Sequence, residues 1–124
     1  MKDVTERKDL DFIVKEFYIR VLADDKIAPV FTSEVKINWE IHLPIISDFW
    51  ENILWGGNKY QDNLLQKHLD FNDKIPLNKL HLERWLLHWR ETLNNSFKGT
   101  NATEILNRAE IIGRFIMYQI QEGK

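Results

Sequence analysis

The first hydrophobic pattern in the chain has the period of a helix. Five apolar residues lie at positions i, i+3, i+4, i+7 and i+11, and they are Leu10, Ile13, Val14, Phe17 and Val21. This spacing predicts a helix of about four turns with one apolar face. Tyr18 stands one step from that face, and we expect the helix to end at Asp24 and Asp25.

The segment that follows, from Lys26 to Phe31, is apolar after its lysine and contains a proline. Pro29 disfavours the helical conformation at Ala28, the residue before it. We therefore expect an irregular connection. Phe31 either anchors this loop or lines a pocket, and the residues alone leave both roles open.

A second helical pattern occupies residues 39–55. Four of its residues share one face: His42, Ile46, Phe49 and Ile53. Pro44 interrupts the pattern, because a proline inside a helix removes a hydrogen bond and its ring meets the preceding turn. We expect regular helix to begin near Leu43, with residues 39–42 in a separate turn or beyond a kink. Gly56 favours an end to the helix.

Residues 62–71 hold a single histidine, His68, behind Leu64 and Leu65. Isolated helices shorter than about 12 residues are marginal in water. A helix here therefore needs an anchor elsewhere in the molecule, and a buried partner for His68 would provide it.

Two more helices are predicted after this segment, over residues 77–97 and from Asn101 onward. Their apolar faces are Leu82, Trp85, Leu86, Trp89 and Leu93 in the first, and Ile105, Ala109, Ile112, Ile116 and Ile120 in the second. We expect Asn101 to cap the last helix, with Glu104 at the capping-box distance. No stretch alternates between apolar and polar residues, so the sequence predicts an all-α protein.

The length of 124 residues suits one domain, and we expect residues 1–124 to form it. Five Trp, seven Phe and three Tyr are many for this length. Either the core is rich in aromatics, or the rings surround something flat and apolar. A net charge of −2 gives no electrostatic reason to expect nucleic acid or anionic lipid as a partner.

Cysteine is absent, which excludes disulfides, thiolate metal sites and a cofactor attached through C-x-x-C-H. The N-terminal residues lack the apolar stretch of a signal peptide. No apolar run approaches the roughly 18 residues of a membrane span. We therefore expect a cytoplasmic protein that does not enter a membrane.

Four histidines are available for chemistry: His42, His68, His81 and His88. No two are four residues apart, so a zinc site of the metalloprotease kind has no support. His81 and His88 have charged neighbours, and we expect both at the surface. Three acidic residues are also expected to be solvated: Asp24, Asp25 and Glu91. His42 and His68 have apolar neighbours, although a buried histidine is more often a satisfied core residue than a ligand.

Several short motifs occur along residues 9–118 in a definite order. They are Phe17-Tyr18, Ile27-Ala28-Pro29-Val30-Phe31, Trp39-x-x-His42, Asp48-Phe49-Trp50, Leu65-Gln66-Lys67-His68 and Leu82-Glu83-Arg84-Trp85-Leu86. In order and spacing they resemble the truncated haemoglobins, specifically the third group. The resemblance implies a globin-like fold, in which a two-over-two helical sandwich surrounds a non-covalent b-type haem.

The resemblance also implies roles for individual residues. His68 resembles the proximal iron ligand, whose second ring nitrogen donates to an acceptor such as a backbone carbonyl. Tyr18 and Trp85 align with ligand-side residues that can donate hydrogen bonds to an iron-bound ligand. His42 aligns with the distal histidine, and because Pro44 follows it closely we expect a gate to ligand entry.

The residues that the resemblance places around the macrocycle are apolar or aromatic. They are Phe31, Ile46, Phe49, Trp50, Leu65 and Trp85. Lys67 and Lys74 are candidate partners of the haem propionates. For Trp85, its position in the apolar stripe equally predicts a plain core residue.

The leading functional hypothesis is a haem protein that binds O₂ and other diatomic ligands reversibly. Two ligand-side donors would retard O₂ loss or polarise its O–O bond, which suits peroxide or reactive-nitrogen chemistry better than bulk transport. The alternative is a peroxidase or a nitric oxide dioxygenase that works with an external reductase. A third hypothesis is a cofactor-free helical interaction module in which His68 is merely packed.

Overall fold

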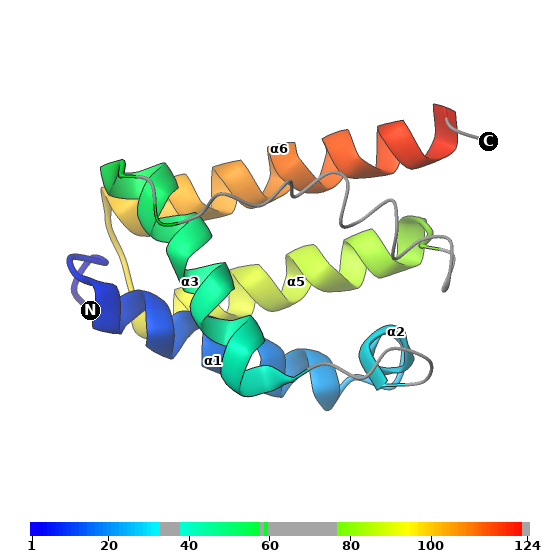
Figure 1. Ribbon diagram of the computed structural model, residues 1–124, viewed down its shortest axis with the longest axis horizontal. Coiled ribbons are helices and arrows are strands. Elements are labelled where there is room, and N and C mark those ends of the chain that lie inside the picture. The colour runs from blue at the N-terminus through cyan, green and yellow to red at the C-terminus, as the bar shows by residue number, and fades with distance from the viewer. Residues whose placement is uncertain (33–37, 58, 60–76, 123–124) are drawn as a thin grey trace.

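The computed structural model describes residues 1–32, 38–57, 59 and 77–122. Within these ranges every regular element is a helix (Figure 1): α1 Arg7–Leu22, α2 Ala28–Thr32, α3 Trp39–Trp55, α5 Lys79–Ser96 and α6 Thr100–Glu122. The all-α prediction is confirmed. In the described part of the chain, no helix is long and apolar enough to cross a membrane.

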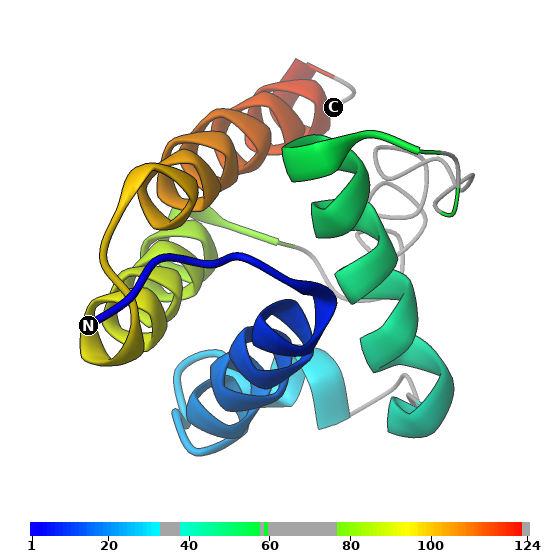
Figure 2. The ribbon, with the colours of Figure 1, turned by 90° about the vertical axis from the view of Figure 1, so that its left-hand side faces the viewer.

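The four long helices form two packed layers (Figure 2). In one layer α1 lies against α3, and in the other α5 lies against α6. Contacts of α1 with α5 and of α3 with α6 join the layers. Three aromatic residues occupy the centre, Phe17, Trp50 and Trp89, and each is at most 2% exposed. The arrangement is the expected two-over-two sandwich.

The predicted apolar face of α1 is buried, and its five residues are at most 1% exposed. The helix begins at Arg7, where the Asp9 carboxylate accepts a hydrogen bond from the Glu6 N–H at 3.3 Å. The prediction of an irregular connection after α1 was wrong, because Ala28–Thr32 is helical. Pro29 lies in the first turn of α2, where an N–H has no partner within the helix and its absence costs little.

The expectation that regular helix begins near Leu43 was also wrong, because α3 is helical over Trp39–Trp55 with Pro44 inside it. The Asn38 side chain accepts a hydrogen bond from the second residue of the helix at 3.2 Å and caps it. Arg7 of α1 donates to the Pro44 carbonyl at 3.2 Å and to the Asp48 carboxylate at 2.7 Å. These contacts hold α3 against α1 beside its proline.

The start of α5 is capped by hydrogen bonds between two residues at its own N-terminus, Asn78 and His81. The Asn78 side chain accepts from the His81 N–H at 3.1 Å, and the Asn78 N–H donates to Nδ1 of His81 at 3.2 Å. His81 thus takes the place of the glutamate or glutamine in a capping box. It is half-buried instead of lying free on the surface, and burial lowers its pKa.

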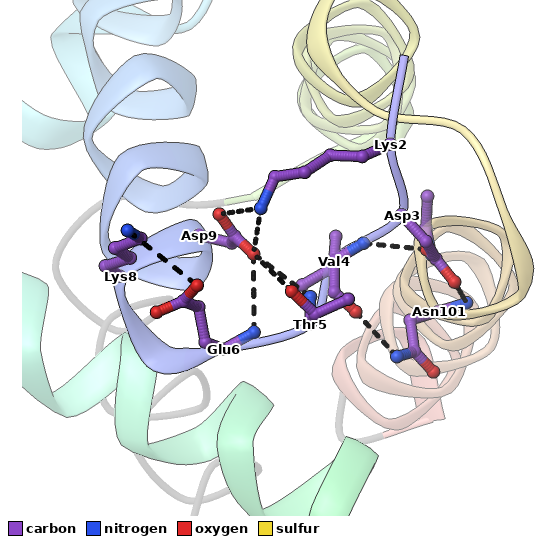
Figure 3. A network of polar contacts seen from close by, with 9 residues as sticks. Lys2, Asp3, Val4, Thr5, Glu6, Lys8, Asp9 and Asn101 are labelled. Atoms are coloured by element: carbon purple, nitrogen blue, oxygen red, sulfur yellow. Dashed lines mark hydrogen bonds and ion pairs between the residues drawn. The ribbon is translucent and has the colours of Figure 1, made fainter.

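The expected cap of α6 was wrong, because the capping residue is Asp3 and not Asn101 (Figure 3). The Asp3 carboxylate accepts from the N–H groups of Asn101 and Ala102, both at 2.9 Å. Asn101 lies inside the helix. Glu104, expected to complete a capping box, forms an ion pair with Arg108 at 2.6 Å.

The segment before α1 is held in place by a second carboxylate. Asp9 accepts from Lys2 Nζ at 3.1 Å and from the Thr5 N–H at 3.0 Å (Figure 3). Gly99 is needed for the close approach of Asp3, since a Cβ at Gly99 would collide with the Asp3 side chain. Its φ of +151° is also one that other residues rarely adopt.

Asp3→Ala is expected to lower the free energy of unfolding by about 1–2 kcal/mol, the usual cost of a lost helix N-cap. Burial would raise the pKa of Asp3, but N–H groups of Asn101, Ala102 and Val4 hold it below 3.8. The contribution is therefore complete above pH 3.8 and is lost as the pH falls through the lower pKa of the folded state. Denaturant titrations at neutral and at acidic pH measure both effects.

Asp3→Asn is the matched control for this prediction. It keeps one acceptor oxygen, so it should cost less than Asp3→Ala at neutral pH, and its cost should not follow the titration of a carboxylate. Equal stability of wild type and Asp3→Ala at neutral pH would contradict the capping role.

Candidate functional site

Tyr18 of α1 and His42 of α3 form a hydrogen-bonded pair between the two helices. The Tyr18 hydroxyl lies 3.2 Å from Nε2 of His42, and their ring centroids are 5.5 Å apart. Tyr18 is 8% exposed, and burial raises the pKa of its phenol. The phenol therefore keeps its proton at neutral pH and can donate a hydrogen bond.

Aromatic side chains from three helices enclose Tyr18. Its ring centroid is 4.9 Å from that of Phe17, 5.7 Å from that of Phe31 and 4.9 Å from that of Trp39. These contacts restrict the directions in which the hydroxyl can point. Phe31 lies beside the polar pair and belongs to helix α2 instead of the loop that it was expected to anchor.

Trp85 of α5 approaches the same region from the other layer. Its ring is edge-on to Phe17, with centroids 6.3 Å apart, and edge-on to Trp89, with centroids 6.0 Å apart. Gly113 of α6 is so close that a Cβ there would lie 3.1 Å from Cζ3 of Trp85. Since Phe17 contacts both Tyr18 and Trp85, the two candidate donors flank one buried ring.

The apolar residues of α3 near this region differ in burial. Ile46 and Phe49 are half-buried and pack against the core. Trp50 is 2% exposed, and its ring lies 5.3 Å from that of Trp89. The structure therefore places Trp50 within the core and leaves Ile46 and Phe49 at its edge.

The sequence and the helical arrangement are similar to those of known proteins. Over 103 residues the chain is 30% identical to the group 3 truncated hemoglobin Ctb of Campylobacter jejuni, with 81% of this chain and 79% of that protein covered. The chain belongs to the group III truncated haemoglobins. A crystal structure of a group III truncated hemoglobin from Campylobacter jejuni matches this truncated haemoglobin with a TM-score of 0.84 at 27% identity, covering 97% of this chain and 95% of that one. No protein-family model matches the sequence.

Truncated haemoglobins are haem-binding globins. The chemistry of the described residues fits a haem. Half-buried apolar side chains from α2, α3, α5 and α6 lie at the edge of the core: Phe31, Leu43, Ile46, Phe49, Trp85, Leu86 and Ile112. Apolar surface left half-exposed favours a largely apolar ligand. Tyr18 and Trp85 add hydrogen-bond donors, which suit a polar diatomic ligand.

Several residues predicted to bind the haem lie outside the described part of this truncated haemoglobin. They are Leu65 and the expected proximal ligand His68, with the candidate propionate partners Lys67 and Lys74. The short helix expected over residues 62–71 lies there as well. Their roles stay predictions from the sequence.

The structure also brings together two residues that were expected in solvent. His88 was predicted at the surface and Asp24 as a solvated charge, and both predictions were wrong. Nε2 of His88 lies 2.7 Å from Oδ2 of Asp24, and each side chain is 7% exposed. The sequence contained a partial indication that His88 is buried, because His88 directly precedes Trp89, a residue of the predicted apolar stripe. Nothing in the sequence indicated that its partner is Asp24, which lies 64 residues earlier.

Proposed function

We propose that this truncated haemoglobin holds a non-covalent haem b in a single domain of residues 1–124 and binds O₂ and other diatomic ligands reversibly. We propose His68 as the protein ligand to iron, and Tyr18, His42 and Trp85 as the ligand-side residues. The apolar lining is proposed to be Phe31, Ile46, Phe49, Leu65 and Trp85, with Trp50 behind them in the core. The observation that carries the proposal is the Tyr18–His42 hydrogen bond beside half-buried apolar side chains.

The chain contributes hydrogen-bond donors in a protected place. When bound, the haem supplies the iron centre at which a diatomic ligand binds. Tyr18 retains its proton because burial raises its pKa, so its hydroxyl can donate to that ligand. Trp85 has an indole N–H, which can only donate. Hydrogen bonds from both groups to a polar ligand such as O₂ slow its departure.

His42 competes with a ligand for the Tyr18 hydroxyl. In the structure Nε2 of His42 is the partner of that hydroxyl. A hydrogen bond from Tyr18 to a ligand therefore requires His42 to give up or share this contact. We propose that His42 acts as the gate to ligand entry, held within reach because α3 stays helical through Pro44.

Two donors beside one ligand favour peroxide or reactive-nitrogen chemistry over bulk O₂ transport. Slow release is a disadvantage for a transporter, whereas a polarised O–O bond assists redox turnover. The same two donors favour the second candidate function, a peroxidase or a nitric oxide dioxygenase that acts with an external reductase. Peroxide turnover measured with and without an electron donor separates a peroxidase from a protein that only binds its ligand reversibly.

Titration of the purified protein with haemin tests the proposal. We expect an intense Soret band that saturates at equimolar haemin, and acid–acetone extraction should release the haem because no cysteine is present to hold it covalently. Absence of a Soret band would overturn the haem proposal and leave the cofactor-free helical interaction module as the remaining hypothesis. Haem that stays with the protein after extraction would contradict non-covalent binding.

A further inference from the structure

Three side chains meet where α1 ends and α5 passes it. Oδ2 of Asp24 accepts hydrogen bonds from Nε of Arg84 and from Nε2 of His88, both at 2.7 Å. We call these three residues the Asp24 clamp. Burial would raise the pKa of Asp24, but its hydrogen bonds with His88 and Arg84 hold it at about 2. The carboxylate is therefore ionised at neutral pH.

In the part of the chain that the structure describes, the His88 imidazole has one hydrogen-bond partner, the Asp24 carboxylate. The Asp24 and His88 side chains are each 7% exposed. Nδ1 of His88 is buried and has no hydrogen-bond partner among the residues that the structure describes. Loss of Asp24 would therefore leave His88 without a hydrogen bond to these residues, and a buried unpaired polar group is costly.

Asp24 also organises the turn that leads into α2. Its Oδ1 accepts from the Lys26 N–H at 3.0 Å, and its backbone carbonyl accepts from the Ala28 N–H at 2.7 Å. The helix that begins there carries Phe31, whose ring lies 5.7 Å from that of Tyr18. One residue thus connects the end of α1, the start of α2 and the side of α5.

Arg84 and His88 are four residues apart, so they lie on the same side of α5. Trp85 is the next residue after Arg84, about 100° further around the helix. Holding Arg84 and His88 against Asp24 therefore sets the rotation of α5 relative to α1. That rotation decides how Trp85 meets Phe17, which is also the neighbour of Tyr18.

We propose that the residues of the Asp24 clamp are positioning residues for the ligand side of the haem pocket. The clamp holds α5 in the rotation at which Trp85 can act together with Tyr18. This inference rests on the proposed function, because it assigns the effect of the clamp on a bound ligand to Trp85. None of the three clamp residues needs to touch the ligand.

The test compares His88→Leu, which removes the hydrogen-bond donor, with His88→Gln, whose amide nitrogen can still donate to Asp24. Asp24→Asn gives a second variant of nearly unchanged size. Asp25→Asn is the matched control, because Asp25 is adjacent and exposed. Two quantities are measured for each protein. One is the ¹⁹F signal of Trp85 in 5-fluorotryptophan-labelled protein without haem, and the other is the O₂ dissociation rate with haem.

We expect His88→Leu and Asp24→Asn to shift the Trp85 signal and to change O₂ dissociation by about three- to tenfold, the range for a displaced hydrogen-bond donor. His88→Gln should recover most of the wild-type behaviour, and Asp25→Asn should match the wild type. In a Trp85→Phe background, His88→Leu should no longer change the O₂ rate, because the clamp acts through Trp85.

Two results would overturn the inference. In the first, His88→Leu and Asp24→Asn lower thermal stability but leave the Trp85 signal and the O₂ rate unchanged, so that the clamp only stabilises the fold. In the second, His88→Leu changes the O₂ rate equally with and without Trp85. If the wild type binds no haem, the proposed function fails separately. The ¹⁹F signal then still decides whether the clamp positions Trp85.

Discussion

His68→Ala is expected to abolish stable haem binding. We propose this imidazole as the protein ligand to iron, and a helix over residues 62–71 would be too short to be stable without such an anchor. The substitution removes both the ligand and the anchor. Equimolar haemin should give the wild type an intense Soret band and the variant only the weak, broad band of loosely associated haem.

His81→Ala is the control for this variant. His81 takes part in the cap of α5 through its Nδ1, so its loss should affect stability and leave the Soret band in place. Free imidazole added to His68→Ala then separates ligation from packing, because it can occupy the vacated ligand position and restore the band. A Soret band in His68→Ala that equals the wild-type band without imidazole would show that His68 is not the ligand.

Tyr18→Phe is expected to speed O₂ dissociation by about ten- to a hundredfold, because a hydrogen bond to a charged or polarised group contributes about 1.5–3 kcal/mol. Phenylalanine keeps the ring and its contacts with Phe17, Phe31 and Trp39, so the packing around position 18 should be retained. The change therefore isolates the hydroxyl. Stopped-flow displacement of O₂ from the reduced, haem-loaded protein measures the rate.

Tyr118→Phe is the matched control, since Tyr118 lies on α6 and is 58% exposed. It should leave the O₂ rate unchanged. In Tyr18→Phe, Nε2 of His42 no longer accepts from Tyr18, and the tautomer with the proton on Nε2 can then donate to the ligand. A double variant with His42→Leu should therefore release O₂ faster than Tyr18→Phe alone.

Trp85→Phe is expected to act on O₂ in the same direction as Tyr18→Phe, because it also removes a donor. If neither variant alters O₂ dissociation or peroxide turnover, the proposed ligand-side donors are wrong. The haem could then be bound as proposed, but the chemistry on its ligand side would need another explanation.

Local sequence patterns were enough to locate the four long helices and to identify the buried faces of α1 and α6 and the buried end of the α5 stripe. Leu93 and Ile105, for example, were assigned to apolar stripes and are each 1% exposed. This succeeds because helical period is a property of neighbouring residues, and burial of one face follows from it. The resemblance to the truncated haemoglobins also depended on short motifs and supplied the family before any contact was known.

Details of the helices depended on residues far away in the chain. Asp3 caps α6 from 98 residues before Asn101, and Arg7 contacts Pro44 across 37 residues. No local pattern could identify either partner. The sequence predicted a cap at Asn101 and a helix that begins near Leu43, because both are reasonable when only neighbouring residues are considered.

The candidate site shows the same division. Motif order suggested Tyr18, His42 and Trp85 one by one, while packing of α1 on α3 brings the Tyr18 hydroxyl to Nε2 of His42. No motif suggested that Asp24 and His88 form a pair. Burial of a carboxylate or an imidazole alone costs free energy, because the group loses its hydrogen bonds to water. A hydrogen bond between the two groups offsets that cost. The packing of α1 against α5 decides that meeting, so it became visible only in the tertiary structure.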